Sequence, residues 1–307
     1  MSQKSSIVNS TFKSKDTEEF LDIIFYRPVG YVMALGFKAL RFTPNAVTVI
    51  SIFVGAAPGY FFYYDDLLLN VVGILLLITA EAMDSADGQL ARITNTKSRI
   101  GRILDGFGGN IWFLSIYLFL GFRLMNEGMS GWIFLLIILC GISHSLQSAM
   151  ADYYRNFYLL FVFGKDKSEV DNSADIWKKY NELSWDGNFI EKLLMRLYLN
   201  YTIEQEFFSK NLRKLYNESV KKFGSTIPNW FSAEYRSLNK KNVKYYNILT
   251  TNTRMVVLFI AIIIKQPLIY FLFEIIILNL VLLYTIMKQE KNSLDLYTAI
   301  SEEDKKC

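Results

Sequence analysis

The stretch MDSADGQLARITNTKSRIGRILDGFGGN, residues 83–110, places three aspartates directly after the apolar run LLLNVVGILLLITAEA, residues 67–82. An ionisable side chain within hydrocarbon costs at least about 2.5–3.5 kcal/mol, so such residues are rare there and usually functional. The stretch therefore indicates a membrane-spanning helix that ends in a functional site at the membrane border.

The composition is that of a protein partly embedded in a membrane and partly in water. Of its 307 residues, 52% are hydrophobic and 20% are charged, which is too apolar for an ordinary soluble domain. The formal net charge of +4 is too small to indicate nucleic-acid binding. Two cysteines exclude a disulfide framework or a zinc site built from thiolates. The polar first residues predict that no signal peptide is cleaved.

The hydropathy pattern predicts an all-α integral membrane protein with six transmembrane helices. A span needs about 20 apolar residues, and Pro267 in the segment KQP predicts a tight turn between the last two spans. Residues 18–42 mix apolar and charged side chains, which suits an interfacial amphipathic helix broken near Pro28 and Gly30. A helix packed on the polar insert is the alternative. The expected spans are 46–64, 67–84, 107–125, 130–152, 254–270 and 270–288.

A long polar stretch, about 155–250, separates the fourth and fifth spans. Two of its segments have helical periodicity and it is rich in aromatic residues, so we expect a helical cytosolic insert rather than a disordered linker. The predicted organisation is an N-terminus with the interfacial helix (1–43), four spans with the aspartate motif at 84–105 (44–153), the insert (154–252), and two spans with a cytosolic tail (253–307).

Basic residues in the loop after the second span predict the orientation of this multi-pass protein. Arg92, Lys97, Arg99 and Arg102 lie there, and cytoplasmic loops carry the excess of Lys and Arg. Both termini, the aspartates and the insert should therefore face the cytoplasm.

The three aspartates form a candidate divalent-metal site. Asp84 and Asp87 share a helix face, and Asp105 would join them if the next helix packs alongside. Hard carboxylate oxygens suit Mg²⁺, Mn²⁺ or Ca²⁺. A metal beside basic residues indicates phosphate chemistry. Charges that merely cap helices are the alternative.

Small and basic residues around the aspartates suit a phosphate ligand. Gly88, Ala91 and Gly101 would let a ligand approach the backbone, and Arg92 can make bidentate contacts with a phosphate.

The pattern D-x-x-D-G-x-x-A-R, eight residues, G-x-x-x-D-x-x-x-D resembles the signature of the CDP-alcohol phosphotransferase (CDP-alcohol phosphatidyltransferase) family. The segment RFTPNAVTV ahead of the first span is also similar to this family. The resemblance covers about 20–152 and 254–288 but not the insert. The motif residues present here are Asp84, Asp87, Gly88, Ala91, Arg92, Gly101 and Asp105.

The resemblance implies phospholipid biosynthesis. A CDP-linked lipid donor such as CDP-diacylglycerol would bind through its pyrophosphate to one or two Mg²⁺ (or Mn²⁺) ions, an alcohol would attack the phosphorus, and CMP would leave. Asp84, Asp87 and Asp105 match the metal positions. The residues expected at the donor site are Gly88, Ala91, Arg92, Gly101, Pro44, Asn45 and Thr48.

One position departs from the signature, because Gly109 replaces the final aspartate, which the resemblance implies is the general base. Asn110 is a candidate for a positioning role, although a carboxamide is not a base near pH 7. His144, in the fourth span, is a candidate base, and a satisfied buried histidine is the alternative. A third explanation is that the chain has lost its activity.

We therefore expect a transferase, with a catalytically degenerate CDP-donor-binding or scaffold membrane protein as the alternative. A transporter is disfavoured, since the two halves show no hydropathy repeat. The resemblance favours inositol or inositol phosphate as the small alcohol acceptor. Other expectations are contact with the lipid bilayer, no nucleic-acid partner and a homodimer. Residues Arg155, Asp152 and Arg102 are candidates for binding the acceptor.

Overall fold

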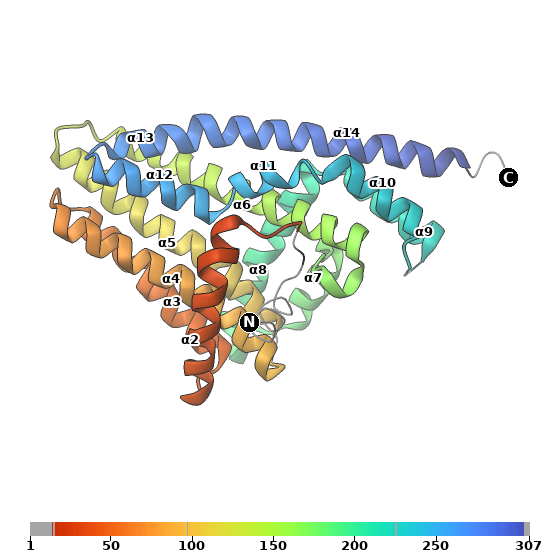
Figure 1. The fold of residues 1–307 in the computed structure, drawn as a ribbon, viewed down its shortest axis with the longest axis horizontal. Coiled ribbons are helices and arrows are strands. Elements are labelled where there is room, and N and C mark those ends of the chain that lie inside the picture. Colours follow the sequence, from red (N-terminus) through yellow and green to blue (C-terminus); the bar gives the residue numbers. More distant parts are fainter. Residues whose placement is uncertain (1–13, 15, 97, 225, 304–307) are drawn as a thin grey trace. The chain divides into compact units, whose positions relative to one another are not determined.

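The computed structural model describes residues 14, 16–96, 98–224 and 226–303, and across these ranges the secondary structure is helical, without strands (Figure 1). The chain forms two compact units. Unit 1 contains Glu18–Ser145 and Thr251–Ile276. Unit 2 contains Leu146–Thr250, the residues from Ile277 onward and the short segment that ends at Thr17.

Unit 1 is a helical bundle in which α3 packs against both α4 and α5, while α2 packs against α4. Helix α6 begins in this unit and ends in unit 2. The bounds are η1 Asp22–Tyr26, α2 Arg27–Ala39, α3 Pro44–Phe62, α4 Leu67–Thr94, α5 Arg99–Asn126, α6 Ile133–Phe163, α12 Thr251–Ile263, α13 Pro267–Leu272 and η3 Phe273–Leu278.

Side-chain caps fix where the helices around the aspartates begin. Thr43 accepts a hydrogen bond from the Ala46 amide at the start of α3, and Asp66 accepts one from Leu69 at the start of α4. Ser98 accepts one from the Gly101 amide at the start of α5. Each cap satisfies an amide that the helix itself leaves unpaired. The register of the motif residues is therefore set locally.

Five helices in the described ranges are long and apolar enough to cross a membrane, which supports an integral membrane protein. The first four correspond to the first four predicted spans. Helix α12 has only 13 residues, about 20 Å at 1.5 Å per residue, so the count of six spans stays a prediction. The five are Pro44–Phe62, Leu67–Thr94, Arg99–Asn126, Ile133–Phe163 and Pro267–Ser301.

The predicted turn at KQP is confirmed. Helix α12 ends at Ile263, Lys265 has a positive φ of 58°, and Pro267 is the first residue of α13. The missing amide hydrogen of proline costs nothing at a helix start.

The predicted break near Pro28 and Gly30 was wrong. The chain passes from the π-helical turn η1 directly into α2, and Pro28 occupies the first turn of α2, where proline is tolerated. Gly30 is buried. A β-carbon added there would lie only 2.8 Å from the Ser85 hydroxyl of α4. The glycine thus permits close packing rather than a kink.

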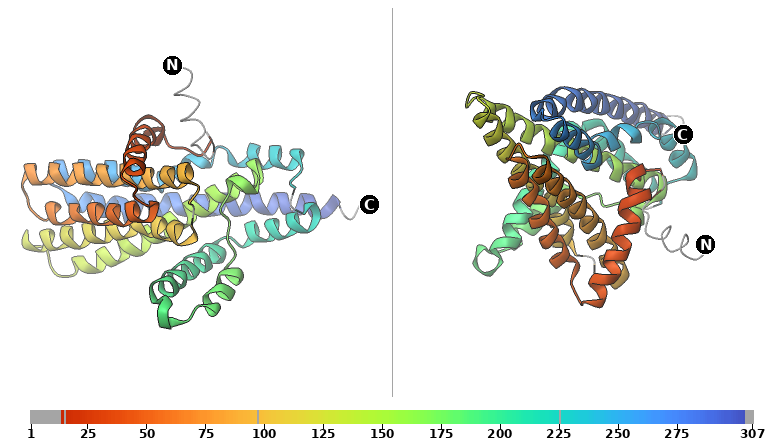
Figure 2. Two further views of the ribbon diagram at one scale, coloured as in Figure 1. Left: turned by 90° about the horizontal axis from the view of Figure 1, so that it is seen from below. Right: turned by 60° about the vertical axis from the view of Figure 1, so that its left-hand side comes forward.

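Unit 2 confirms the predicted helical character of the stretch after the fourth span (Figure 2). Helix α6 continues to Phe163, beyond the predicted limit of the fourth span at 152, and α14 packs against α9, α10 and α11. The bounds are η2 Lys165–Lys167, α7 Ser173–Glu182, α8 Trp185–Phe208, α9 Lys210–Phe223, α10 Asn229–Asn239, α11 Val243–Ile248 and α14 Asn279–Glu303.

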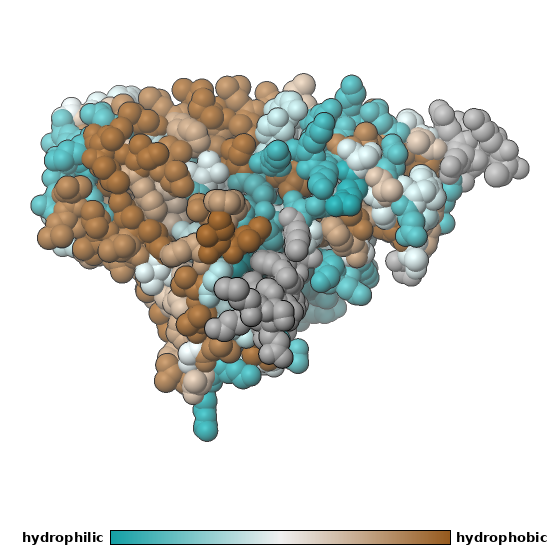
Figure 3. All heavy atoms as spheres, in the orientation of Figure 1, coloured by the Kyte–Doolittle hydropathy of each residue, from teal (hydrophilic) through white to brown (hydrophobic). Residues whose placement is uncertain are grey.

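Apolar side chains gather on the outer surface of unit 1 (Figure 3). Phe53 and Leu68 are each 73% exposed, and Trp132, directly before α6, is 78% exposed. Soluble proteins rarely expose such extensive apolar surface. The surface is that expected of helices in contact with lipid.

Candidate metal and donor site

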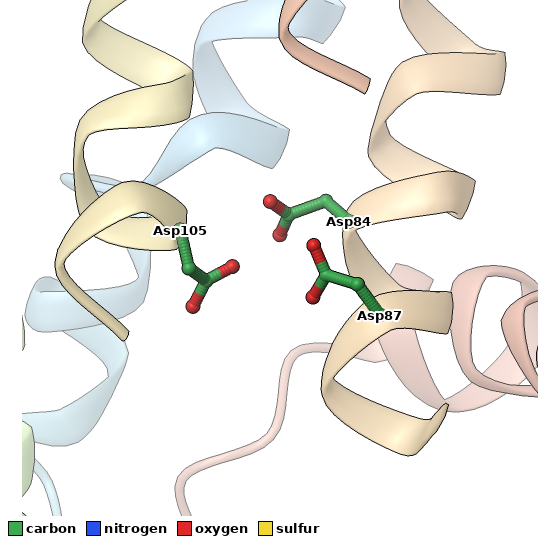
Figure 4. A group of neighbouring side chains, drawn as sticks. All are labelled: Asp84, Asp87 and Asp105. Carbon is green, nitrogen blue, oxygen red and sulfur yellow. The ribbon is translucent and has the colours of Figure 1, made fainter. Parts of the chain in front are cut away.

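Three carboxylates from two helices converge in unit 1 (Figure 4). Asp84 and Asp87 lie one turn apart on α4, and Asp105 lies in the second turn of α5. One oxygen from each side chain lies within 4.8 Å of the other two. The convergence expected from the spacing is present.

Asp87 carries an unsatisfied oxygen at this point. Its side chain is 4% exposed, and its Oδ2 atom is buried with no hydrogen-bond partner among the described residues. The Thr48 hydroxyl, which donates to the Pro44 carbonyl, lies beside the same carboxylate. A buried carboxylate oxygen without a partner is costly, and a cation would satisfy it.

The donor set fits a hard divalent ion. All three groups offer carboxylate oxygens, which Mg²⁺ and Ca²⁺ prefer, at metal–oxygen distances of about 2.0–2.6 Å. Two oxygens bound to the same ion lie at most about twice the metal–oxygen distance apart. The three oxygens here lie within 4.8 Å of one another, so they can share one ion. Asp84, Asp87 and Asp105 would hold the ion.

Two side chains lie close to the backbone of Gly101. A β-carbon added at Gly101 would lie 2.5 Å from Asn45 Oδ1 and 2.9 Å from Ser98 Oγ, closer than side chains tolerate. Asn45, one residue into α3, therefore contacts the start of α5 directly. The structure brings together Asn45 and Gly101, two of the expected donor-site residues.

Open space adjoins the motif on α4. A β-carbon added at Gly88 would meet no described atom within 4 Å. Ala91 and Arg92 follow in the next turn and are half-buried, as is Arg102 at the start of α5. The space beside Gly88 suits a bound group, and the roles of these residues in donor binding stay predictions.

Gly109 lies one turn after Asp105, on the same face of α5. A β-carbon added at Gly109 would meet no described atom within 4 Å, so steric crowding does not explain the glycine. Asn110 donates from Nδ2 to the Gly106 carbonyl of its own helix at 3.3 Å. The side-chain amide of Asn110 is thus hydrogen-bonded to the backbone of α5.

The structure does not bring His144 to the aspartates. Its Nδ1 lies 3.2 Å from the Tyr117 hydroxyl and 3.7 Å from Glu274 Oε1, and its ring lies 4.7 Å from that of Phe113. Phe113 and Tyr117 follow Asp105 by about 12 and 18 Å along α5. The alternative of a satisfied buried histidine fits this placement.

His144 belongs to a buried polar network. Arg254 on α12 donates from Nε to Glu274 at 3.1 Å, and both side chains are fully buried. The Tyr270 hydroxyl lies 3.1 Å from that of Tyr117 and 3.4 Å from Glu274. Sequence reasoning missed this network, although a glutamate in an apolar run is itself a signal.

Asp152 and Arg155 belong to unit 2. Asp152 accepts a hydrogen bond from Asn156 Nδ2 at 2.9 Å, and both Asp152 and Arg155 lie near Tyr201 of α8. Their role in binding the acceptor stays a prediction.

Sequence reasoning also missed a polar group of four residues in unit 1, one of which, Glu81, lies one turn before Asp84 on α4. Asn252 Nδ2 donates to Glu19 Oε2 and to Asp22 Oδ1, at 2.9 Å each. Glu81, one turn before Asp84, is within electrostatic reach of Glu19, Asp22 and Asp105. Asp22 and Asn252 are separated by 230 residues in the sequence, so no local pattern could reveal the pairing.

The model of the CDP-alcohol phosphatidyltransferase family matches residues 41–160, which contain all three aspartates. An uncharacterised protein of Aquifex aeolicus (strain VF5) is 35% identical over 69 residues, or 22% of this chain and 34% of that relative. The match thus spans about a third of the length of this curated relative. No solved structure matches the chain significantly. The resemblance seen in the motif is confirmed: through residues 41–160, the chain is matched to the CDP-alcohol phosphatidyltransferase family.

Proposed function

We propose that this protein is a membrane transferase of phospholipid biosynthesis. It moves the phosphatidyl group of a CDP-linked donor such as CDP-diacylglycerol to a small alcohol and releases CMP. The observation that carries the proposal is the convergence of Asp84, Asp87 and Asp105 within 4.8 Å, inside the segment that matches the family.

Each part of the site has a role in this reaction. One or two Mg²⁺ or Mn²⁺ ions, held by the three aspartates, would neutralise the charge of the donor pyrophosphate. Gly88 and Ala91 leave room beside α4 for the cytidine, and Arg92 and Arg102 attract its phosphates. Pro44, Asn45 and Thr48, at the start of α3, contribute to the donor site, where Asn45 lies against Gly101 of α5.

The bonds change at one phosphorus atom. The alcohol oxygen bonds to the phosphatidyl phosphorus, the bond from that phosphorus to the CMP oxygen breaks, and CMP leaves with the bonding electrons. The alcohol proton passes to water or to the phosphate of the departing CMP. Gly109 supplies no base, so deprotonation is the step in which we expect this chain to be slow.

We expect the active site to face the cytoplasm. Lys and Arg in the loop after α4 favour a cytoplasmic active site, where CDP-linked donors and small alcohols meet. The expected homodimer remains part of this proposal.

Incubating the purified chain with CDP-diacylglycerol, Mg²⁺ and a panel of alcohols tests the function. We expect CMP and a new phospholipid in equal amounts, and neither product from Asp87→Asn. CMP formed without any lipid product would identify a hydrolase and contradict the proposal.

A catalytically degenerate donor-binding protein is the second candidate, and Gly109 is the observation that favours it. It predicts that CDP-diacylglycerol binds in the presence of Mg²⁺ and that no CMP forms with any alcohol. Calorimetry with the donor, followed by an assay for CMP in the same sample, separates the two functions.

A further inference from the structure

Helix α8 of unit 2 exposes an apolar face along its length. The backbone is non-helical at residues 186–188, so the regular helix begins at Phe189 and extends for about 30 Å to Phe208. Phe189 is 59% exposed, Ile190 71% and Phe207 62%. We name the exposed apolar residues of the regular helix the outer face. They are Phe189, Ile190, Leu193, Leu197, Ile203 and Phe207.

The same helix buries a second apolar face. Met195, Leu199 and Thr202 are buried, and at 100° per residue they lie on the side of the helix opposite to the outer face. A helix at the surface of a soluble protein needs one apolar stripe, whereas a helix that is apolar on two sides is normally covered on both. The outer face of α8 therefore indicates a partner.

Exposed apolar residues are concentrated on α8 rather than spread over the insert. Within α9, α10 and α11, the large apolar side chains that are exposed are Val220 and Trp230 alone. Single exposed apolar residues of this kind are normal in soluble proteins, but a contiguous apolar patch marks an interaction surface. The interaction surface of the insert is thus the outer face.

Aromatic and basic side chains lie together near the start of α8. The Lys192 ammonium lies 4.8 Å from the ring centre of Tyr180 and 5.2 Å from that of Trp185. The Arg196 guanidinium lies 5.9 Å from the ring centre of Trp177, and both tryptophans are exposed. Such side chains gather where hydrocarbon meets water, because each joins an apolar body to a polar end. This group therefore suits a membrane–water boundary.

Charged residues within the outer face favour a lipid surface over a protein partner. Arg196 and Glu204 lie two turns apart, between the apolar residues, and Arg196 is exposed. The core of a protein interface is depleted in charged residues, and burying a charge there is costly. At the headgroup level, by contrast, a long charged side chain reaches water while its apolar neighbours enter the lipid.

The last turns of α8 are bonded to the helix of the fourth span where that span is expected to end. Counted from the start of α6, about 20 residues cross the hydrocarbon layer, which places its border near Asp152. Gln205 Nε2 donates to the Ala149 carbonyl at 2.9 Å, and Ser209 Oγ donates to the Tyr154 hydroxyl at 3.3 Å. These hydrogen bonds hold α8 at the level of the membrane border.

We propose that α8 lies in the membrane surface as an interfacial amphipathic helix, with its outer face inserted at the boundary between headgroups and acyl chains. Arg196 and Glu204 extend to the headgroups. The insert is thus anchored to lipid beside the end of the fourth span. This inference concerns the insert and holds whether or not the chain is an active transferase.

Photo-crosslinking of the unmodified chain tests the contact with lipid. The chain is placed in nanodiscs of a phosphatidylcholine that carries a diazirine near the top of one acyl chain, illuminated and digested. We expect lipid adducts in peptides from residues 189–208, as in peptides from the membrane spans, and none in peptides from α9, residues 210–223. Adducts confined to the spans would overturn the inference.

Labelled variants separate lipid from a protein partner. Ile190→Cys and Leu197→Cys, each with Cys140→Ala and Cys307→Ser, are labelled with a fluorophore that responds to polarity. Asn217→Cys, at an exposed polar position of α9, is the matched control in the same background. In vesicles that contain nitroxide-labelled lipid, the labels on α8 should emit at shorter wavelength and lose most of their emission, and the control label should do neither.

Two other results of the labelling would contradict the inference. A shift to shorter wavelength without quenching by the nitroxide lipid would identify a second copy of the chain or another protein on the outer face. Emission from α8 equal to that of the control would place the outer face in water.

Discussion

The Asn45 side chain lies against the backbone of Gly101, so closely that a β-carbon at Gly101 would come within 2.5 Å of Asn45 Oδ1. The contact joins the start of α3 to the start of α5, four residues before Asp105. It gives a physical reason for a glycine at this position of the motif: a β-carbon would displace the Asn45 side chain and the Ser98 hydroxyl that caps α5.

Gly101→Ala should destabilise the protein by about 0.5–2 kcal/mol, the usual cost of losing a helix cap, because the added β-carbon displaces the Ser98 hydroxyl, and should lower the thermal midpoint in detergent. Gly106→Ala, on the same helix, is the matched control, because a β-carbon there meets no described atom within 4 Å. Adding Asn45→Ala should restore part of the loss. Equal midpoints for Gly101→Ala and Gly106→Ala would contradict the contact.

Removing the divalent ion with EDTA should abolish CMP release, and Mg²⁺ or Mn²⁺ should restore it. Asp87→Asn should prevent that recovery, because it removes the charge of a buried carboxylate whose Oδ2 lacks a partner. The exposed Asp166 of unit 2 provides a control as Asp166→Asn. Full activity in EDTA would reject the metal site.

Gly109→Asp should raise kcat by about 10²–10⁴-fold, the typical gain from a general base. An added β-carbon there meets no described atom within 4 Å, so the substitution begins without a clash. Gly109→Asn has nearly the same shape and no basic group, and should give no gain. A rate unchanged by aspartate would mean that deprotonation is not slow in this chain.

His144→Ala should lower stability by about 1–3 kcal/mol, because it leaves buried groups of the Tyr117–Glu274 network without a partner. We expect kcat to stay within about two-fold of the parent, since His144 packs beside Tyr117 and not beside Asp105. Thermal midpoints and single-turnover rates on the same samples separate the effects. A large fall in kcat at an unchanged midpoint would restore His144 as the base.

Asp16 should make unit 2 sensitive to acid. Burial acts to raise the pKa of Asp16, but hydrogen bonds from Tyr158 and Arg236 outweigh it and hold the pKa below its usual value. A lowered pKa stabilises the folded state above the unfolded value of about 3.9, and this contribution is lost as the pH falls through the folded value. The midpoint difference between the parent and Asp16→Asn should therefore shrink below about pH 4. A difference that is constant with pH would contradict this.

Local patterns predicted the parts of the fold and the site that depend on neighbouring residues. The first four spans follow from apolar runs, the turn at KQP from Pro267, and the shared face of Asp84 and Asp87 from helical periodicity. Gly101 was expected to permit a close approach. Its partner Asn45 was assigned only to the donor site, because the contact joins two helices.

Contacts between distant residues were not predictable. Asn252 and Glu19 are 233 residues apart, and neither stands out within its own segment. His144 is a further case: the sequence left open a base or a satisfied buried histidine, and the contacts that bear on the choice, with Tyr117 and Glu274, come from other helices.

The open space at Gly109 also has a genetic meaning. Two of the four glycine codons, GGU and GGC, become aspartate codons by a single base change, and an added β-carbon at Gly109 meets no described atom within 4 Å. With either of these codons, gain of the aspartate is one mutational step. A growth selection for the lipid product could recover the aspartate directly from spontaneous mutants.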